Sequence, residues 1–280
     1  MRDIRIAAAI FHSPLDEIEK SLDRMDLRVK SARQQGVRLL CFPEMNITGY
    51  STRDNARLTA RPFSREITER ISRMAAEGEM VILAGMMEKN ADGRLFVSHG
   101  VFAPSGISGI YRKLHISPPE KSLFSPGEEI PLFGIKGLTF GIQLCYDAHF
   151  PELSTHMALN GADIIFIPHA SPRGTPQKKY RSWLRHLKAR AYDNSIFIVA
   201  VNQVGDNGNG LIFPGIALVI SPSGEVMDQK LCEKEDMLVV DLKEDLLTRV
   251  RSSSMHFFLP NRRQDIPGLA TRLYRADHFS

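Results

Sequence analysis

The sequence of 280 residues predicts an α/β protein, an αββα four-layer sandwich built from two similar α/β halves. Two observations predict this fold. The apolar runs are short and rich in β-branched residues, which is typical of strands that are buried on both faces. The order of strands, helices and turns in the first half also recurs in the second. Two sheets packed face to face, with helices outside, would bury such strands. A doubly wound single sheet is the alternative, and paired hairpins fit it less well.

The strands are expected where short apolar runs occur, at residues 4–10, 37–42, 81–86, 97–103, 138–144, 164–167, 196–201, 216–220 and 237–240. A long amphipathic helix is expected after the first strand, because apolar residues recur three or four positions apart from Leu15 to Val29. Ser13 and Pro14 are typical of the N-cap and first position of such a helix. Two further helices are predicted over residues 151–160 and 180–194.

The internal repeat is visible in two pairs of segments. Residues 36–43 resemble residues 161–168, since each leaves a helix and forms a strand that ends at a proline. Residues 80–113 and 195–230 each give a strand, a Gly-rich hairpin and a second strand, and each contains a Pro-Ser-Gly turn. These pairs indicate two similar halves within one domain, which we assign to residues 1–255.

Composition limits the classes of function. The formal charge is +4, and Lys and Arg are mixed with Asp and Glu except at residues 180–190 and around Arg262 and Arg263, so no nucleic-acid-binding module is indicated. The N-terminus is too charged for a signal peptide, and no apolar run reaches membrane-spanning length. The three cysteines form no C-x-x-C pair, which argues against a disulfide framework and a zinc site. We expect a soluble, cytoplasmic protein with no nucleic-acid or membrane partner.

Cys145 follows the apolar run 138–144, and a helix is expected from Pro151, so its thiol lies where a strand gives way to a tight turn. Such a turn exposes a side chain and directs backbone N–H groups towards a substrate. A buried structural cysteine is the alternative, and we assign that role to Cys41. Cys232 lies in a polar segment and is expected to be a surface thiol.

Glu44 and Lys113 are the charged residues that could assist a nucleophilic thiol at Cys145. Glu44 directly follows a buried strand, and Lys113 stands in a half-apolar stretch. A carboxylate and an ammonium that converge on a thiol would supply a base and a fixed positive charge for a tetrahedral oxyanion. Amide hydrolysis requires both.

Three ordered segments resemble the signature segments of the carbon–nitrogen hydrolase (nitrilase) superfamily, and most closely its amidase and N-carbamoyl-amine hydrolase branch. They are Phe42-Pro43-Glu44, Tyr111-Arg112-Lys113-Leu114-His115, and Leu144-Cys145-Tyr146-Asp147 with Phe150-Pro151-Glu152. The likeness also includes residues 124–127, 161–163 and 189–194, and it spans about residues 4 to 242. It implies the αββα sandwich that the repeat predicts.

By motif position, the resemblance implies that Cys145 is the nucleophile, Glu44 the general base and Lys113 the oxyanion-stabilising cation. Glu120 matches a second active-site glutamate, with Glu128 and Glu129 as the alternatives. The implied mechanism is ping-pong. Cys145 forms a thioester, ammonia or an amine leaves, and water hydrolyses the thioester. No metal or organic cofactor is needed.

The residues after Cys145 indicate the branch. In similar true nitrilases Trp-Glu follows the cysteine, whereas Tyr146-Asp147 favours an amidase or a carbamoylase acting on a small non-peptide C–N bond. Asp147 could instead serve only as a charge at a helix N-terminus. A true nitrilase and a non-catalytic interaction module with the same fold are the alternative functions. The acyl group and the leaving amine stay open.

Substrate-binding residues are expected in the loops around the thiol, and the candidates are Tyr50, Tyr146, His149, His169 and Arg173. Similar N-carbamoyl-amino-acid hydrolases hold the substrate carboxylate with an arginine in the loop that contains Arg173, and an exposed loop arginine is the alternative. A Cys–His mechanism through His115, His149 or His169 is a further alternative. Histidines near apolar strands are more often structural.

The C-terminal segment, residues 256–280, departs from the sandwich pattern. It resembles the arm that many enzymes of this superfamily lay across a dimer partner, which implies a homodimer or a higher homo-oligomer. A disordered tail is the alternative.

Overall fold

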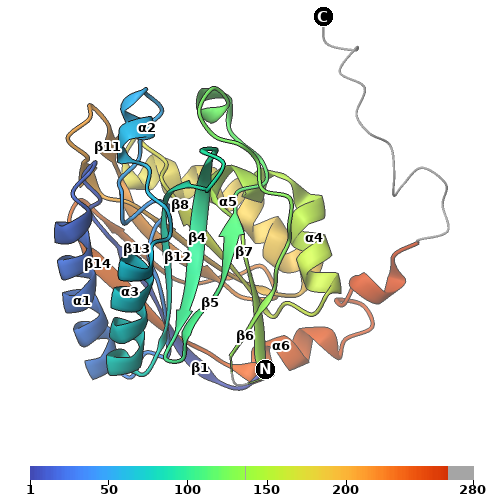
Figure 1. Cartoon of the computed structure of the whole chain (residues 1–280). Coiled ribbons are helices and arrows are strands. Elements are labelled where there is room, and N and C mark those ends of the chain that lie inside the picture. The colour runs from blue at the N-terminus through green and yellow to red at the C-terminus, as the bar shows by residue number, and fades with distance from the viewer. Residues whose placement is uncertain (136, 264–280) are drawn as a thin grey trace, which may run out of the picture.

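The computed structural model describes residues 1–135 and 137–263, and it contains two six-stranded sheets (Figure 1). The first sheet has the order β14 (Asp236–Leu242), β1 (Ile4–Ile10), β2 (Leu39–Cys41), β3 (Val81–Lys89), β4 (Leu95–Ala103) and β5 (Gly106–Arg112). The second has the order β13 (Val226–Cys232), β12 (Gly215–Ile220), β9 (Phe197–Asn202), β8 (Ile164–His169), β7 (Leu138–Ile142) and β6 (Phe133–Ile135). A small hairpin joins β10 (Gly205–Asp206) to β11 (Ile212–Phe213).

The two sheets repeat one topology. In each, three parallel strands lie side by side, namely β1, β2 and β3 or β7, β8 and β9. On one side of them is an antiparallel pair, β4 and β5 or β12 and β13, and on the other an antiparallel edge strand, β14 or β6. The predicted duplication is therefore confirmed at the level of strand order and direction.

Helices cover the outer faces of both sheets (Figure 1). On the first sheet lie α1 (Ile18–Gln34) and α3 (Arg65–Gly78), and on the second lie α4 (Pro151–Leu159) and α5 (Pro176–Asn194). The remaining helices are α2 (Asn55–Thr59) and α6 (Glu244–Arg251), with single 3-10 turns at Pro118–Glu120, Cys145–His149 and Leu259–Asn261. The αββα sandwich predicted from the sequence is confirmed.

The alternation of side chains along each strand builds two apolar layers. In β1, Ile6, Ala8 and Ile10 lie in the core between the sheets, whereas Ala7 and Ala9 pack against the helices outside. All five are fully buried. Burial of a side chain as large as isoleucine contributes about 1.5–3 kcal/mol, so both faces of these strands hold the fold together.

The first helix begins later than predicted. Ser13 is not an N-cap, because the helix starts at Ile18 and the intervening residues form a turn in which Asp16 has a φ of 62°. Backbone contacts from distant loops hold this turn, with the Leu15 N–H donating to Asn207 O and the Asp16 N–H to Thr48 O. Tertiary hydrogen bonds therefore override the local helix-start signal.

Two other helices also differ from the prediction. The helix predicted from residue 180 begins at Pro176, where the Thr175 side chain caps the Lys178 N–H. The helix α3 was not predicted, although Ile67, Ile71 and Met74 form an apolar stripe at helical spacing.

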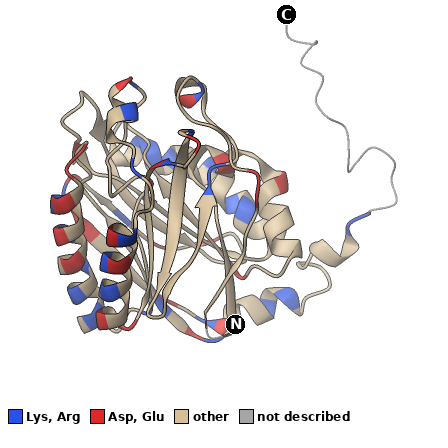
Figure 2. Cartoon of the chain, viewed as in Figure 1, with Lys and Arg blue, Asp and Glu red and all other residues tan. Residues whose placement is uncertain are grey.

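The two helices that cover the first sheet carry charged residues of both signs. Figure 2 shows Lys and Arg interleaved with Asp and Glu along α1 and α3. Arg70 of α3 pairs with Glu19 and Asp23 of α1. No helix in the described part of the chain is long and apolar enough to cross a membrane.

Candidate active site

The candidate catalytic residues follow the carboxyl ends of parallel strands. Glu44 comes after β2, Lys113 directly follows β5, and Cys145 comes after β7. Because β2, β5 and β7 run towards the same edge of the sandwich, their following loops meet there. A contact between the two halves confirms the meeting, since the Ala170 N–H after β8 donates to Glu44 Oε2 at 2.8 Å.

Lys113 lies between two buried carboxylates. Its Nζ donates to Glu44 Oε1 at 2.9 Å and to Glu120 Oε2 at 2.9 Å, and all three side chains are almost fully excluded from solvent. The Glu120 carboxylate also accepts the Ser117 N–H at 3.0 Å and the Tyr50 hydroxyl at 3.2 Å. Glu120 is thereby held by three donors, and it fixes the ammonium opposite Glu44.

Cys145 opens a 3-10 turn at the end of the β7 segment, and its backbone φ is 45°. This left-handed conformation is unfavourable for a residue with a side chain, and such strain occurs where surrounding structure fixes a functional group. The first N–H groups of a helical turn have no partner within it. The turn therefore places the half-buried Cys145 at the N-terminal end of a helical turn, beside its first backbone N–H groups.

Burial and charge together set the protonation of the site. Burial is the main reason that the pKa of Glu44 is raised to about 7, with Lys113 opposing the shift and Glu120 adding to it. Burial alone would lower the pKa of Lys113, but Glu44 and Glu120 raise it well above its usual value. Burial and the Glu44 charge raise the pKa of the Cys145 thiol, and Lys113 opposes them. At neutral pH the site therefore holds a thiol, a fixed ammonium and a carboxyl near its midpoint.

Asp147 braces the turn that presents Cys145. Its buried carboxylate accepts the Leu144 N–H at 3.0 Å, the Tyr111 hydroxyl at 2.8 Å and the His115 N–H at 2.8 Å. Tyr111 and His115 lie on either side of Lys113 in the chain. Asp147 thus joins the nucleophile turn to the segment that bears the cation, a connection that a charge at a helix N-terminus would not make.

Three predicted substrate-binding residues lie near the site in different ways. Tyr50 is buried, and its hydroxyl contacts Glu120. Tyr146 is partly exposed, and its ring lies 5.6 Å from the ring of His149. His149 is exposed and lies 4.4 Å from the ring of His186. Their roles in binding a substrate stay predictions.

The other two candidates lie on either side of Ala170. His169 is buried and stacks on Trp183 at 4.1 Å, its Nδ1 lies 2.8 Å from Ile167 O, and burial holds the pKa of the ring well below its usual value. Arg173 is exposed at a loop position with a φ of 68°, where its N–H donates to Ile212 O. Whether its guanidinium reads a carboxylate stays a prediction.

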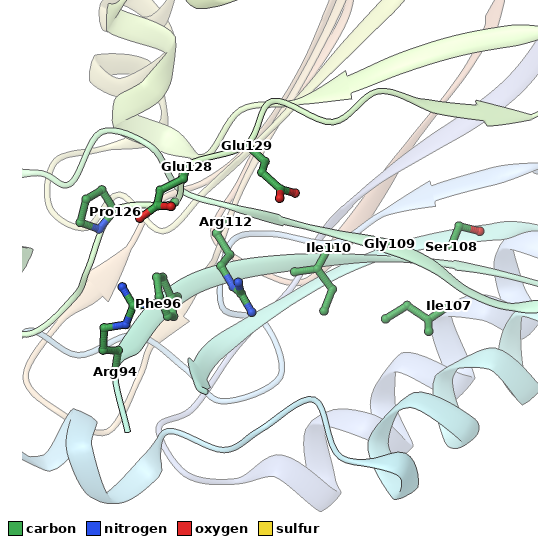
Figure 3. A pocket seen from close by; sticks show the side chains of 11 residues that line it. Arg94, Phe96, Ile107, Ser108, Gly109, Ile110, Arg112, Pro126, Glu128 and Glu129 are labelled. Atoms are coloured by element: carbon green, nitrogen blue, oxygen red, sulfur yellow. The ribbon is translucent and has the colours of Figure 1, made fainter. Parts of the chain in front are cut away.

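Glu128 and Glu129, the alternatives to Glu120, lie elsewhere. Both are exposed and line a groove of about 430 Å³ together with Arg94, Phe96 and residues of β5 (Figure 3). Successive side chains of a strand point to opposite faces, so Arg112 lines this groove while Tyr111 and Lys113 point to the catalytic side. Among the three glutamates, Glu120 is the one in contact with Lys113.

Lys179 and Gln203 also lie at the site, although neither belongs to a motif in the sequence. The Gln203 amide donates to Glu44 O at 2.7 Å and fixes the backbone of the predicted base. Lys179 donates to Ser171 Oγ at 2.7 Å beside Ala170. Lys179 lies one helical turn before Trp183 on the same face of α5, but the helix predicted from residue 180 does not include it.

The described residues contain no cluster of three or more His, Cys, Asp or Glu side chains suited to a metal ion. The expectation that no metal takes part stays a prediction.

Comparison with known proteins gives matches over nearly the full chain. A nitrilase of Pyrococcus abyssi is 29% identical over 272 residues, which cover 94% of this chain and 98% of the relative. An (R)-stereoselective amidase of a Pseudomonas species is 29% identical over 235 residues, covering 83% and 82%. The solved structure of a mutant Nesterenkonia amidase superposes with a TM-score of 0.79 at 24% identity, covering 93% of this chain and 94% of that one, and supports the fold.

The family model for carbon–nitrogen hydrolases matches residues 5–252. This span includes Glu44, Lys113, Glu120 and Cys145, the residues that the resemblance pointed to. The chain belongs to the carbon–nitrogen hydrolase family of the nitrilase superfamily.

Proposed function

We propose that this protein is an amidase that hydrolyses a small non-peptide amide or carbamoyl bond through a thioester on Cys145. The observation that supports it most is the Lys113 ammonium held 2.9 Å from both Glu44 and Glu120 in a buried site whose charges act on the Cys145 thiol. A base, a fixed cation and a nucleophile are the groups that amide hydrolysis requires.

Acylation uses each of these groups once. Glu44 accepts the Cys145 proton while Sγ attacks the carbonyl carbon, and the oxyanion that forms is stabilised by Lys113 and by backbone N–H groups of the turn. The carbon–nitrogen bond then breaks, and Glu44 passes the proton to the leaving nitrogen. Ammonia or an amine departs and leaves the acyl group on Cys145.

In deacylation, water replaces the thiol as the nucleophile, and the sulfur becomes the leaving group. Glu44 accepts a proton from water, and the hydroxide attacks the thioester carbon. The carbon–sulfur bond breaks, the sulfur regains the proton, and a carboxylic acid leaves. A base with a pKa of about 7 suits both half-reactions, because it must be ionised to accept a proton and protonated to donate one near neutral pH.

The choice of an amide over a nitrile is supported by the sequence after the nucleophile. Tyr146-Asp147 departs from the Trp-Glu of similar true nitrilases, and Asp147 is committed to holding the turn. The similarity to an amidase agrees with this choice. Because a nitrilase is also among the relatives, nitriles are included in the substrate screen below.

A substrate screen tests the proposal. Purified protein is given aliphatic amides, ω-amides, N-carbamoyl amines, N-carbamoyl amino acids and the matching nitriles, and ammonia release is measured. We expect turnover of at least one amide or carbamoyl compound, and its loss in Cys145→Ala while the fold is retained by circular dichroism. The matched control Cys41→Ala changes a thiol that is buried in the core. Turnover of nitriles alone, or full activity of Cys145→Ala, would overturn the proposal.

A further inference from the structure

Lys179 is a partly buried ammonium with no carboxylate partner. Its Nζ donates to Ser171 Oγ at 2.7 Å and to Pro172 O at 3.3 Å, and both acceptors are neutral. Across residues 1–135 and 137–263, no Asp or Glu lies within ion-pair distance of it, in contrast to Lys113 with two carboxylates. A cation that has lost part of its hydration without gaining a counter-ion favours binding an anion.

The helix α5 directs Lys179 towards the catalytic edge. Trp183, one turn further along the same face, stacks on His169 at the end of β8. Lys179 therefore lies over the loop that follows His169, where its two acceptors are found. That loop is fixed by Asn202, which accepts the Ser171 N–H at 2.9 Å and donates to Ser171 O at 3.0 Å.

The same loop also forms a hydrogen bond to Glu44, the general base of the proposed reaction. The Ala170 N–H donates to Glu44 Oε2, and Ser171 is the next residue. The ammonium and the Glu44 carboxylate therefore contact consecutive residues of one loop. Burial lowers the pKa of Lys179, and the negative charge of a Cys145 thiolate opposes this, as expected for groups that share one site.

Two other cations of this region differ from Lys179. Arg173 and Lys178 are both exposed, and water solvates their charges. Lys179 alone of the three is partly withdrawn from solvent and is held by oxygens of the loop next to Glu44.

We propose that Lys179 binds a carboxylate at the far end of the substrate's acyl chain. This inference rests on the proposed amidase function and narrows its substrate class to the monoamides of short dicarboxylic acids. An acyl chain that reaches from Cys145 to Lys179 is expected to be short, because Lys179 and Glu44 contact consecutive residues of one loop. The ammonium selects the substrate by charge and takes no part in bond breaking.

Kinetics with a matched pair of amides test the inference. Succinamate and butyramide have similar chains, and only the first has a terminal carboxylate. In Lys179→Met we expect the ratio of kcat/KM for succinamate to that for butyramide to fall about ten- to a hundredfold, the range for a hydrogen bond between charged groups. The control Lys178→Met removes an exposed charge of the same helix turn and should leave this ratio unchanged.

Binding without turnover provides a second test. Calorimetry on Cys145→Ala should detect succinamate, and the double variant Cys145→Ala with Lys179→Met should bind it at least about tenfold more weakly. This measurement does not depend on hydrolysis, so the inference and the proposed function can fail separately. A wild-type protein that releases no ammonia from any amide overturns the function, whereas equal succinamate binding with and without Lys179 overturns the inference.

The rate of Cys145 alkylation by iodoacetamide separates substrate binding from activation of the thiol. We expect Lys179→Met to slow this alkylation only slightly, because Lys179 lowers the pKa of the Cys145 thiol less than Lys113 does. A large fall in alkylation, together with equal losses on succinamate and butyramide, would mean that Lys179 acts on the thiol and would overturn the inference. A fall in the substrate ratio in Arg173→Met, with none in Lys179→Met, would transfer the role to Arg173.

Discussion

At the scale of single residues, Glu44 gives the site a pH dependence with a defined sign. It accepts a proton only when it is ionised, so kcat/KM for a neutral amide should rise with pH through about 7.

The negative charge of Glu120 raises the pKa of Glu44, so Glu120→Gln should move this rise to lower pH. A pH profile of kcat/KM measures the shift, and the rate of Cys145 alkylation replaces it if turnover is too slow. Glu128→Gln, at the exposed groove, is the control, and an unmoved rise in Glu120→Gln would contradict the assignment.

Asp147 is the residue whose effect on catalysis should exceed its effect on stability. Asn at position 147 keeps the size of the side chain but cannot accept all of the donors from Leu144, Tyr111 and His115. An unmatched buried donor costs about 1–3 kcal/mol of stability. The loss of a hydrogen bond to the Leu144 N–H should also displace the turn that contains Cys145. We expect Asp147→Asn to lower kcat at least about tenfold and to destabilise the fold in urea.

A comparison variant isolates the positioning effect of Asp147. Ser154→Ala removes the hydroxyl that accepts the Gln143 amide at 2.9 Å, a buried hydrogen bond that does not reach Lys113 or the Cys145 turn. It should cost a similar free energy of unfolding and spare kcat. Equal losses of kcat in the two variants would show that Asp147 acts only through overall stability.

At the scale of elements, the N-caps of α3 and α5 offer a matched pair. Ser64 caps the Ile67 N–H of α3, and Thr175 caps the Lys178 N–H of α5. Each replacement by Ala should cost about 1 kcal/mol in urea unfolding. Only Thr175→Ala should also lower the succinamate to butyramide ratio, because the turn that it loosens contains Lys179. If Ser64→Ala changed that ratio equally, the effect of Thr175→Ala could not be attributed to the position of Lys179.

The elements also show how far the sequence could be interpreted. Buried strands were predicted because β-branched runs are a local signal, and Glu44, Lys113 and Cys145 were found because each follows such a run or matches a motif. The start of α1 was wrong, since hydrogen bonds to Asn207 and Thr48 decide it and these partners are distant in sequence. The contacts of Asp147 could not be predicted for the same reason, because they arise only when the segments around β5 and β7 pack together.

At the scale of the whole molecule, we predict a homodimer or higher homo-oligomer that depends on the C-terminal segment. Of residues 256–280, those from 264 onward lie outside the described residues. In the part that is described, Phe258 is exposed, and its ring lies 5.3 Å from that of Tyr192, which is 42% exposed. Exposed apolar side chains that gather at one place are typical of interfaces.

Sedimentation measures this assembly. The full chain should sediment as a dimer or larger species, and a chain that ends at residue 255 should shift towards the monomer. Leu58→Ser, which changes an exposed apolar residue on α2, is the control and should not alter the mass. A full chain that sediments as a monomer at all concentrations would contradict the prediction.

The division of the site between the two sheets has a consequence for folding. Glu44 and Lys113 belong to the half built on β1 to β5, and Cys145 to the half built on β7 to β9, with Ala170 and Gln203 reaching across to Glu44. Either half could regain its strands without assembling a nucleophile, a base and a cation. Recovery of ammonia release during refolding should therefore lag behind recovery of the far-ultraviolet circular dichroism signal. The rate at which ammonia release recovers would then measure the rate at which one sheet docks onto the other.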